Sequence, residues 1–175
     1  KGNAYIVEKL IEKNANVNIG NENGFTPLHV AILNAVDNND VIDLILNTIT
    51  NVDIPDYEDW TALHFAADKG NAYIVEELIK KNANVNIGNE NGDTPLHIAV
   101  SRNHVKVVEY LVKNKNIQIN KQNDDGDTPL HFASDKNNRD LMRYLFSEGA
   151  DPNILNYEDP QKIAFPEDQR YITYQ

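Results

Sequence analysis

The sequence predicts an all-α fold, a helical solenoid of stacked repeats joined by short hairpin loops. An octet centred on the pattern Thr-Pro/Ala-Leu-His occurs four times, and its threonines are spaced by 35, 33 and 34 residues. A near-constant period of this size is typical of solenoids, in which each repeat buries its apolar face only against its neighbours. Paired apolar residues at helical spacing follow each octet. The octets span 24–31, 59–66, 92–99 and 126–133.

Each octet is expected to start the first of two helices in its repeat. Threonine is a favourable N-cap, and proline is favoured at the first helical position, where its missing N–H leaves no bond unmade. Ala62 replaces the proline in one repeat without breaking the predicted helix. A small residue recurs at one position, where a larger side chain would hold the neighbouring helix away. The N-caps are Thr26, Thr94 and Thr128, the prolines are Pro27, Pro95 and Pro129, and the small residues are Ala31, Ala66, Ala99 and Ala133.

A polar break such as 68–71 ends each first helix, and a second helix follows with an apolar stripe that is expected to bury against the adjoining repeats. The connection in the repeat that begins at Thr26 is two residues longer than the connection in the repeat that begins at Thr94. A longer turn is therefore expected near 35–39. The apolar pairs are Ile6-Val7 with Leu10-Ile11, Val41-Ile42 with Ile45-Leu46, Ile74-Val75 with Leu78-Ile79, Val107-Val108 with Leu111-Val112, and Leu141-Met142 with Leu145-Phe146.

Turn-forming residues such as those in 82–86 and 88–92 follow each second helix and predict a tight, hairpin-like connection between repeats. We therefore expect the chain, 1–175, to form a single repeat array. Its expected parts are a partial repeat over 1–24, full repeats over 25–59, 60–92, 93–126 and 127–159, and a degenerate cap with a tail over 160–175. The last of these keeps the phase of the repeat but loses the octet, as terminal repeats of solenoids often do.

The first 24 residues duplicate a later part of the chain. Residues 1–24 match residues 69–92 except where Lys9 corresponds to Glu77 and Glu12 to Lys80. Such close identity two repeats apart indicates duplication of a two-repeat unit. A segment resembling 61–68 is then expected before Lys1, in a longer repeat array.

Composition limits the classes of partner. The net charge is −11 at pH 7, so the chain repels phosphate backbones and anionic membrane surfaces. No run approaches the roughly eighteen apolar residues that a membrane span needs. The absence of cysteine excludes disulfides and thiolate metal sites, and it fits a reducing interior without fixing the compartment. We expect a monomer that binds neither nucleic acid nor membrane.

Two features resemble metal sites. Four histidines recur at one octet position, but stacked helices lie about 8–10 Å apart, too far for neighbouring imidazoles to reach one ion at about 2.0–2.1 Å. Hydrogen bonds that lock repeats together are the favoured role for these histidines. The acidic segment 123–127 resembles a calcium loop, but Lys121 and Phe132 stand at its first and last ligand positions, so an acidic hairpin tip is favoured. The octet histidines are His29, His64, His97 and His131.

No motif for catalysis stands out. The chain has no phosphate-cradling glycine loop and no serine in a nucleophile elbow, and its carboxylates are scattered over polar turns and second helices. The sequence therefore predicts no enzyme, no cofactor and no bound metal.

The octets, the step of 33 to 35 residues, the paired apolar residues and phrases such as 82–86 and 149–153 together resemble ankyrin repeats, to about Ala164. Departures are Ala62 for proline, Asp59 for the glycine before the octet, and Asn103 and Asn137 for the glycine between helices. The resemblance implies an ankyrin-type stack of antiparallel helix pairs with projecting hairpins, and a concave face that binds other proteins.

The candidate binding residues are the variable ones on the hairpin tips and at the ends of the first helices. Aromatic residues are enriched among interface hot spots, while acidic residues would steer a basic partner. The alternative for Phe25 and Trp60 is that they cover the apolar edge of a neighbouring hairpin. The candidates are Phe25, Tyr57, Trp60, Glu58, Glu90, Asp93, Arg102, Asp124 and Asp127.

The predicted function is a protein–protein interaction scaffold or adaptor module with a basic protein partner. Two alternatives are a structural spacer within a longer array and a substrate-recruiting module of a larger enzyme. The variable tips favour the scaffold, and the repetition of Glu22 and Asn23 as Glu90 and Asn91 favours the spacer.

Overall fold

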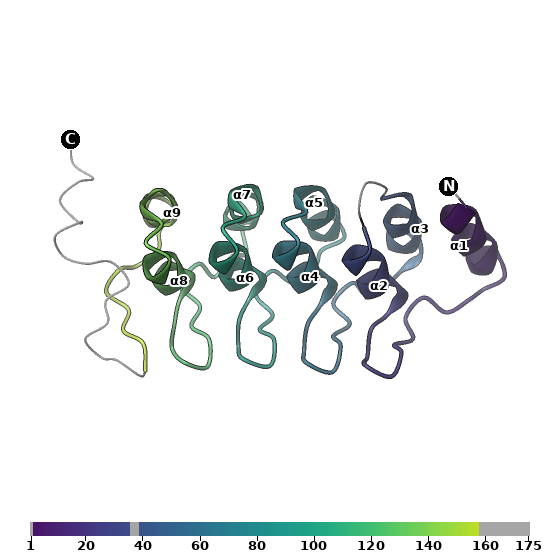
Figure 1. The fold of residues 1–175 in the computed structure, drawn as a ribbon, viewed down its shortest axis with the longest axis horizontal. Helices are drawn as coiled ribbons and strands as arrows, with labels where there is room; N and C mark the ends of the chain where they lie inside the picture. The colour runs from purple at the N-terminus through teal and green to yellow at the C-terminus, as the bar shows by residue number, and fades with distance from the viewer. Residues whose placement is uncertain (1, 36–38, 158–175) are drawn as a thin grey trace. The chain divides into compact units, whose positions relative to one another are not determined.

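The computed structural model describes residues 2–35 and 39–157, with side chains from residue 4 onward. It consists of two compact units, Lys1–Asn84 and Val85–Gln175. The boundary between the units falls inside the predicted repeat over 60–92, after its second helix. Each unit contains stacked pairs of α-helices joined by long hairpins (Figure 1).

The helices alternate between two kinds, as the sequence predicts. First helices begin at the octets, and second helices follow them. The first unit contains α1 (Gly2–Glu12), α2 (Pro27–Leu33), α3 (Asp40–Thr48), α4 (Ala62–Asp68) and α5 (Ala72–Lys80). The second unit contains α6 (Pro95–Ser101), α7 (Val105–Val112), α8 (Pro129–Asp135) and α9 (Arg139–Ser147). Since the described residues form helices and no β-sheet, the all-α repeat fold is confirmed.

Each first helix packs against its own second helix and, within a unit, against the neighbouring first helix. In the first unit α2 packs on α3 and along α4, and α4 packs on α5. In the second unit α6 packs on α7 and along α8, and α8 packs on α9. The α2–α3 connection runs over 34–39, whereas the connections after α4, α6 and α8 are shorter. The predicted turn near 35–39 lies partly outside the described residues, at 36–38.

The first helices are fixed at their N-termini by a reciprocal capping box between threonine and histidine. In each, the threonine N–H donates to Nδ1 of the histidine three residues later, at 3.0 to 3.1 Å. An accepting Nδ1 leaves the ring proton of the neutral imidazole on Nε2. In the second unit, Nε2 of His97 lies 3.0 Å from the backbone oxygen of Asp127, in the following hairpin. This bond confirms the predicted structural role for His97.

Burial keeps His29 and His97 neutral at pH 7. Burial lowers the pKa of His97 to about 4, against the smaller opposing effects of the Asp127 backbone and carboxylate. Burial also lowers the pKa of His29, although Asp56 and the Ile54 backbone act in the other direction. Protonation of either ring would place a charge inside the repeat stack, which low dielectric disfavours.

The turn between paired helices needs a left-handed residue. Gly70 adopts φ +67°, and Asn103 and Asn137 adopt +60° and +49° at the equivalent positions. Asparagine is among the residues that tolerate this region best. The two departures from glycine are therefore compatible with the fold. The next residue caps the second helix: Asn71 and Asn138 each accept a backbone N–H, from Ile74 and Leu141.

The core of each unit lies between the helix pairs. Ala66, Ala99 and Ala133 are fully buried, as predicted, whereas Ala31 on α2 is half-buried. The paired apolar residues of the second helices are buried in α3, α5, α7 and α9, apart from a few half-buried members. The core leucine of every octet is at most 1% exposed. These leucines are Leu28, Leu63, Leu96 and Leu130.

The terminal helix α1 differs from its duplicate α5. Ile74 and Leu78 on α5 are 0% exposed, whereas the matching Ile6 and Leu10 on α1 are 57% and 54% exposed. The two helices have nearly the same sequence. Within the described residues, α4 packs on α5, whereas α1 packs on α3.

This contrast predicts different costs for one substitution at two duplicate positions. Leu78→Ala should lower the free energy of unfolding by about 2–5 kcal/mol, since it leaves a cavity in a packed core. Leu10→Ala should change it by no more than about 0.5 kcal/mol, as for other exposed positions. Urea unfolding of both variants at pH 7 measures the difference. Equal losses at the two positions would contradict the burial that the structure assigns.

The lowered pKa of His97 predicts a stability that falls in mild acid. His97 binds a proton below about pH 6.5 in the unfolded chain but only near pH 4 in the folded chain. The stability that its neutral ring contributes is therefore fully present above pH 6.5 and is lost progressively as the pH falls toward 4. For this residue the loss between pH 7 and pH 5 amounts to about 2 kcal/mol.

Urea unfolding at several pH values tests this prediction. His97→Asn keeps an acceptor for the Thr94 N–H but does not titrate, so its stability should depend less on pH in this window than that of the unmodified chain. Identical pH dependence in the two proteins would show that His97 is not the residue responsible.

Candidate functional site

Each hairpin is held together by one polar side chain at its base. The side-chain oxygen of this residue accepts the backbone N–H groups two and four positions later, at 2.8 to 3.1 Å. Its own N–H donates to the carbonyl four positions later. The hairpin therefore closes on itself and holds its tip residues outward. The residues in this role are Asn21, Asp56, Asn89 and Asn123.

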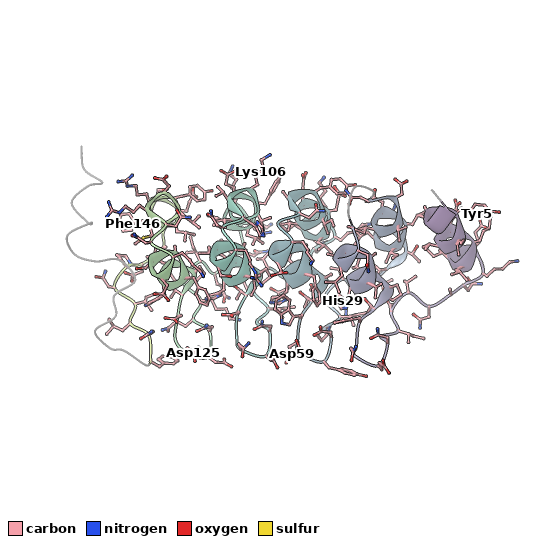
Figure 2. All side chains as sticks on the ribbon, in the orientation of Figure 1. Tyr5, His29, Asp59, Lys106, Asp125 and Phe146 are labelled. Carbon is pink, nitrogen blue, oxygen red and sulfur yellow. The ribbon has the colours of Figure 1, made fainter. Side chains whose placement is uncertain are left out.

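Neighbouring hairpins within a unit are joined at their tips. In the first unit the Tyr57 N–H donates to the Asn23 carbonyl at 3.3 Å. In the second unit the Asp124 N–H donates to the Asn91 carbonyl at 3.0 Å, and the Tyr157 N–H to the Asp125 carbonyl at 2.9 Å. These bonds hold neighbouring hairpin tips together within each unit. Figure 2 labels Asp59 and Asp125 at two of the tips.

Glycine is required where one tip rests on the next. Gly24 adopts φ +80°, and a Cβ there would lie 2.8 Å from the Tyr57 nitrogen and 2.9 Å from its ring. Gly126 has the same relation to Tyr157. Asp59 replaces this glycine in one hairpin and adopts φ +60°. Asp is one of the non-glycine residues most often found in this region.

The first unit holds an aromatic cluster. The Phe25 ring meets the Phe65 ring edge-on, with centroids 5.7 Å apart, and the Trp60 and Phe65 rings lie 5.1 Å apart. His29 and His64 border the same cluster. Phe25 and Trp60 are half-buried. Both therefore cover apolar surface of Phe65 on α4 (Ala62–Asp68), not the edge of a neighbouring hairpin, and both keep part of their rings exposed.

Tyr57 is the exposed aromatic residue of this site. Its side chain is 77% exposed at the hairpin tip, and the adjacent Glu58 is also exposed. Trp60 belongs to the same hairpin, since the Asp56 carboxylate accepts the backbone N–H of Trp60. The structure therefore brings together three of the sequence candidates, Tyr57, Glu58 and Trp60, on one hairpin beside Phe25.

In the second unit, two acidic candidates act as links between hairpins. The Asp93 carboxylate accepts the Asn123 amide at 2.8 Å, and the Asp127 carboxylate accepts the Asn156 amide at 2.9 Å. Both aspartates are half-buried. Burial raises the pKa of Asp93, the bond from Asn123 lowers it, and nearby aspartates raise it further. These two carboxylates contribute to the packing of the hairpins as well as to the charge of the surface.

The remaining candidates lie on exposed positions of the second unit. Glu90 and Asp124 occupy hairpin tips, and Asp125 lies next to Asp124. Arg102 is exposed at the C-cap of α6, on the helical part of the surface and not on a tip. The exposed acidic candidates therefore lie on hairpin tips, whereas Arg102 lies at the end of helix α6.

Three residues that contribute to the site or to its packing were not among the sequence candidates. Phe65 contacts both Phe25 and Trp60, but its place in the octet predicted only a role in the core. Tyr157, 66% exposed, repeats the tip position of Tyr57 in the last described hairpin. The Asp53 carboxylate accepts the Asn84 N–H at 3.1 Å, and burial raises its pKa. The recurrence of Tyr four positions before the octet threonine, or its equivalent, could have identified Tyr157.

The described part of the chain lacks two other kinds of site. Over residues 2–35 and 39–157, no group of three or more His, Asp or Glu side chains is arranged to hold a metal ion. Among the helices of the same ranges, none is long and apolar enough to cross a membrane.

Comparison with known proteins agrees with the geometry of helix pairs and hairpins. The family model described as ankyrin repeats (3 copies) matches residues 1–89, 34–123 and 73–156. Comparison with curated proteins gave no match. Ankyrin repeats are generally protein–protein interaction modules and are typically non-enzymatic. Because the matches together cover residues 1–156, the chain belongs to the ankyrin repeat family.

Proposed function

We propose that the chain is an interaction scaffold or adaptor module that binds a basic partner protein through its hairpin tips and the ends of its first helices. This is the side for which the family resemblance implies a concave surface. The observation that carries the proposal is Tyr57, a 77% exposed aromatic side chain on a hydrogen-bonded tip beside half-buried Trp60 and Phe25. Exposed aromatic residues held on a hydrogen-bonded tip are of the type enriched among interface hot spots.

Charge supports a basic partner. The chain carries a net charge of −11, and exposed acids occupy the tips in both units, with Glu58 in the first and Glu90, Asp124 and Asp125 in the second. The raised pKa of Asp93, to which its aspartate neighbours contribute, also reflects this local density of acids. Exposed acids accelerate encounter with a basic partner more than they add affinity.

Substitutions of Tyr57 and of Trp60 would affect different properties of the protein. Trp60 packs on Phe65, so its replacement disturbs both the fold and the surface. Tyr57 contributes its backbone N–H to the ladder, and this bond survives a change of side chain. Substitution of Tyr57 therefore separates binding from stability.

Tyr57→Ser should weaken capture of the partner by about 30-fold or more, which corresponds to a hot spot of about 2 kcal/mol. The measurement is affinity capture from cells of the source organism with quantitative mass spectrometry, followed by titration with the purified partner. Tyr5→Ser is the matched control, since Tyr5 is 62% exposed on α1, away from the tips. The spacer alternative predicts that neither variant changes the set of captured proteins.

The acidic residues at the hairpin tips should increase the rate at which the basic partner associates. At low salt, Asp124→Asn with Asp125→Asn should slow binding of the partner severalfold, and the difference should shrink as salt screens the charges. Asp140→Asn with Glu148→Gln is the control, because it changes the net charge equally at exposed positions on and just after α9. Stopped-flow kinetics at two salt concentrations provides the rates. Equal slowing by both pairs would mean that net charge alone matters.

A further inference from the structure

Two hairpin tips carry an asparagine directly before a glycine. The pairs are Asn23-Gly24 in the first unit and Asn91-Gly92 in the second, and both asparagines are exposed. In such a pair the backbone nitrogen of the glycine can attack Cγ of the asparagine side chain, because glycine has no side chain that obstructs the approach. Asparagine is accordingly one of the thermolabile residues.

The fold excludes the bulkier residues that would slow this attack. Gly24 and Gly92 adopt φ +80° and +74°. A Cβ on Gly92 would lie 2.8 Å from the Asp124 nitrogen in the following hairpin, just as a Cβ on Gly24 would meet the next tip of the first unit. The hairpin that accepts Asp59 at this position has Glu58 before it, so it contains no pair of this kind. The contact between tips therefore maintains the reactive sequence.

Hydrogen bonds inside each hairpin oppose the same attack. The Gly24 N–H donates to the Asn21 carbonyl at 2.9 Å. In the second unit the Gly92 N–H donates to the Asn89 carbonyl at 2.8 Å. Attack requires rotation about ψ of the residue before the glycine, and this rotation turns the glycine N–H away from the carbonyl. The reaction therefore needs a hairpin that has opened locally.

The side chain at the base of the hairpin restrains this opening further. The Asn89 side-chain oxygen accepts the Asn91 N–H and the Asp93 N–H, each at 3.0 Å. In the first unit the Asn21 side-chain oxygen accepts the equivalent pair of N–H groups, also at 3.0 Å. Removal of either side chain should make its own hairpin open more often and leave the other hairpin unchanged.

We propose that Asn23 and Asn91 are sites of spontaneous deamidation, at rates set by the opening of their own hairpins. The glycine nitrogen forms a bond to Cγ, the bond from Cγ to Nδ2 breaks, and the side-chain nitrogen leaves as ammonia with the proton from the glycine nitrogen. Water then opens the succinimide ring at one of its two carbonyl carbons, and the ring nitrogen regains a proton. The reaction involves no oxidant and no partner protein, so it is independent of the proposed function.

The two products affect the tip differently. Aspartate keeps the backbone and adds one negative charge. In isoaspartate the backbone runs through the former side chain, which places an extra carbon between Cα of residue 91 and the nitrogen of Gly92. The carbonyl that accepts the Asp124 N–H at 3.0 Å is then no longer bonded to that nitrogen. The tip cannot keep both its own turn and its link to the next hairpin.

The duplicated sequence gives this proposal an internal control, because residues 20–24 are identical to residues 88–92. Asn89→Ala removes the side-chain acceptor of the second hairpin only. Deamidation of Asn91 at neutral pH should then be at least about 10-fold faster, whereas Asn23 in the same molecules should keep its rate. Peptide mass spectrometry after timed incubation, with separation of aspartate from isoaspartate, measures both sites in one sample.

Two further variants and one natural residue complete the comparison. Asn89→Asp keeps an acceptor, as Asp56 does at the same position of another hairpin, and should retain the slow rate. Asn21→Ala should accelerate deamidation of Asn23 alone. Asn16 controls for exposure, since it is exposed but precedes the β-branched Val17, and it should stay unmodified.

The unmodified chain in urea supplies the rate without hairpins, and this comparison needs no variant. Both sites should deamidate at least about 10-fold faster in urea than in the folded chain. Equal rates in the two states would overturn the proposal, as would a folded chain that stays intact while the unfolded chain converts completely. Equal acceleration of both sites by Asn89→Ala, in a protein that keeps its helical circular dichroism, would show that the individual hairpin does not set the rate.

Discussion

One backbone hydrogen bond in each repeat, from the threonine N–H to Nδ1 of the octet histidine, determines much of the remaining geometry. It starts the first helix and leaves the ring proton on Nε2. In the second unit that proton points toward the Asp127 backbone, so the cap of one repeat supports the hairpin of the next. The Asp127 carboxylate in turn accepts the Asn156 amide. Helix caps and hairpin links are therefore one connected hydrogen-bond system within the unit.

The features that could be predicted from the sequence are those with local causes. Threonine caps, proline at the first helical turn and paired apolar residues each act within a few residues, and the structure has the corresponding helices. The left-handed Asn103 and Asn137 also follow from local preference. Links over about thirty residues, such as that from Asn123 to Asp93, depend on the spacing of neighbouring hairpins and have no local signature. The exposure of the tip residues depends on these links, so the candidate site was less predictable than the fold.

The position immediately before the octet threonine illustrates this limit. Phe25 and Trp60 fill it by packing on Phe65, whereas Asp93 and Asp127 fill it with a carboxylate bonded to the next hairpin. From sequence alone these four residues are assigned to variable positions on the surface. In the structure all four are half-buried and support their neighbours, so their variation changes the way hairpins are joined as well as the surface. Tyr57, at the neighbouring tip, lies with one edge of its ring against Gly24 and leaves most of its side chain exposed.

The near identity of residues 1–24 and 69–92 also has a genetic consequence. Homologous exchange between the two copies would remove a whole number of repeats and rejoin the chain in phase, at a point where both copies present the same turn and helix. Each hairpin bond described within a unit reaches only to the following hairpin, so the contacts on either side of such a junction would have the same chemistry as before. Loss of the stretch between the two copies would therefore shorten the array by two repeats and leave the junction chemically unchanged.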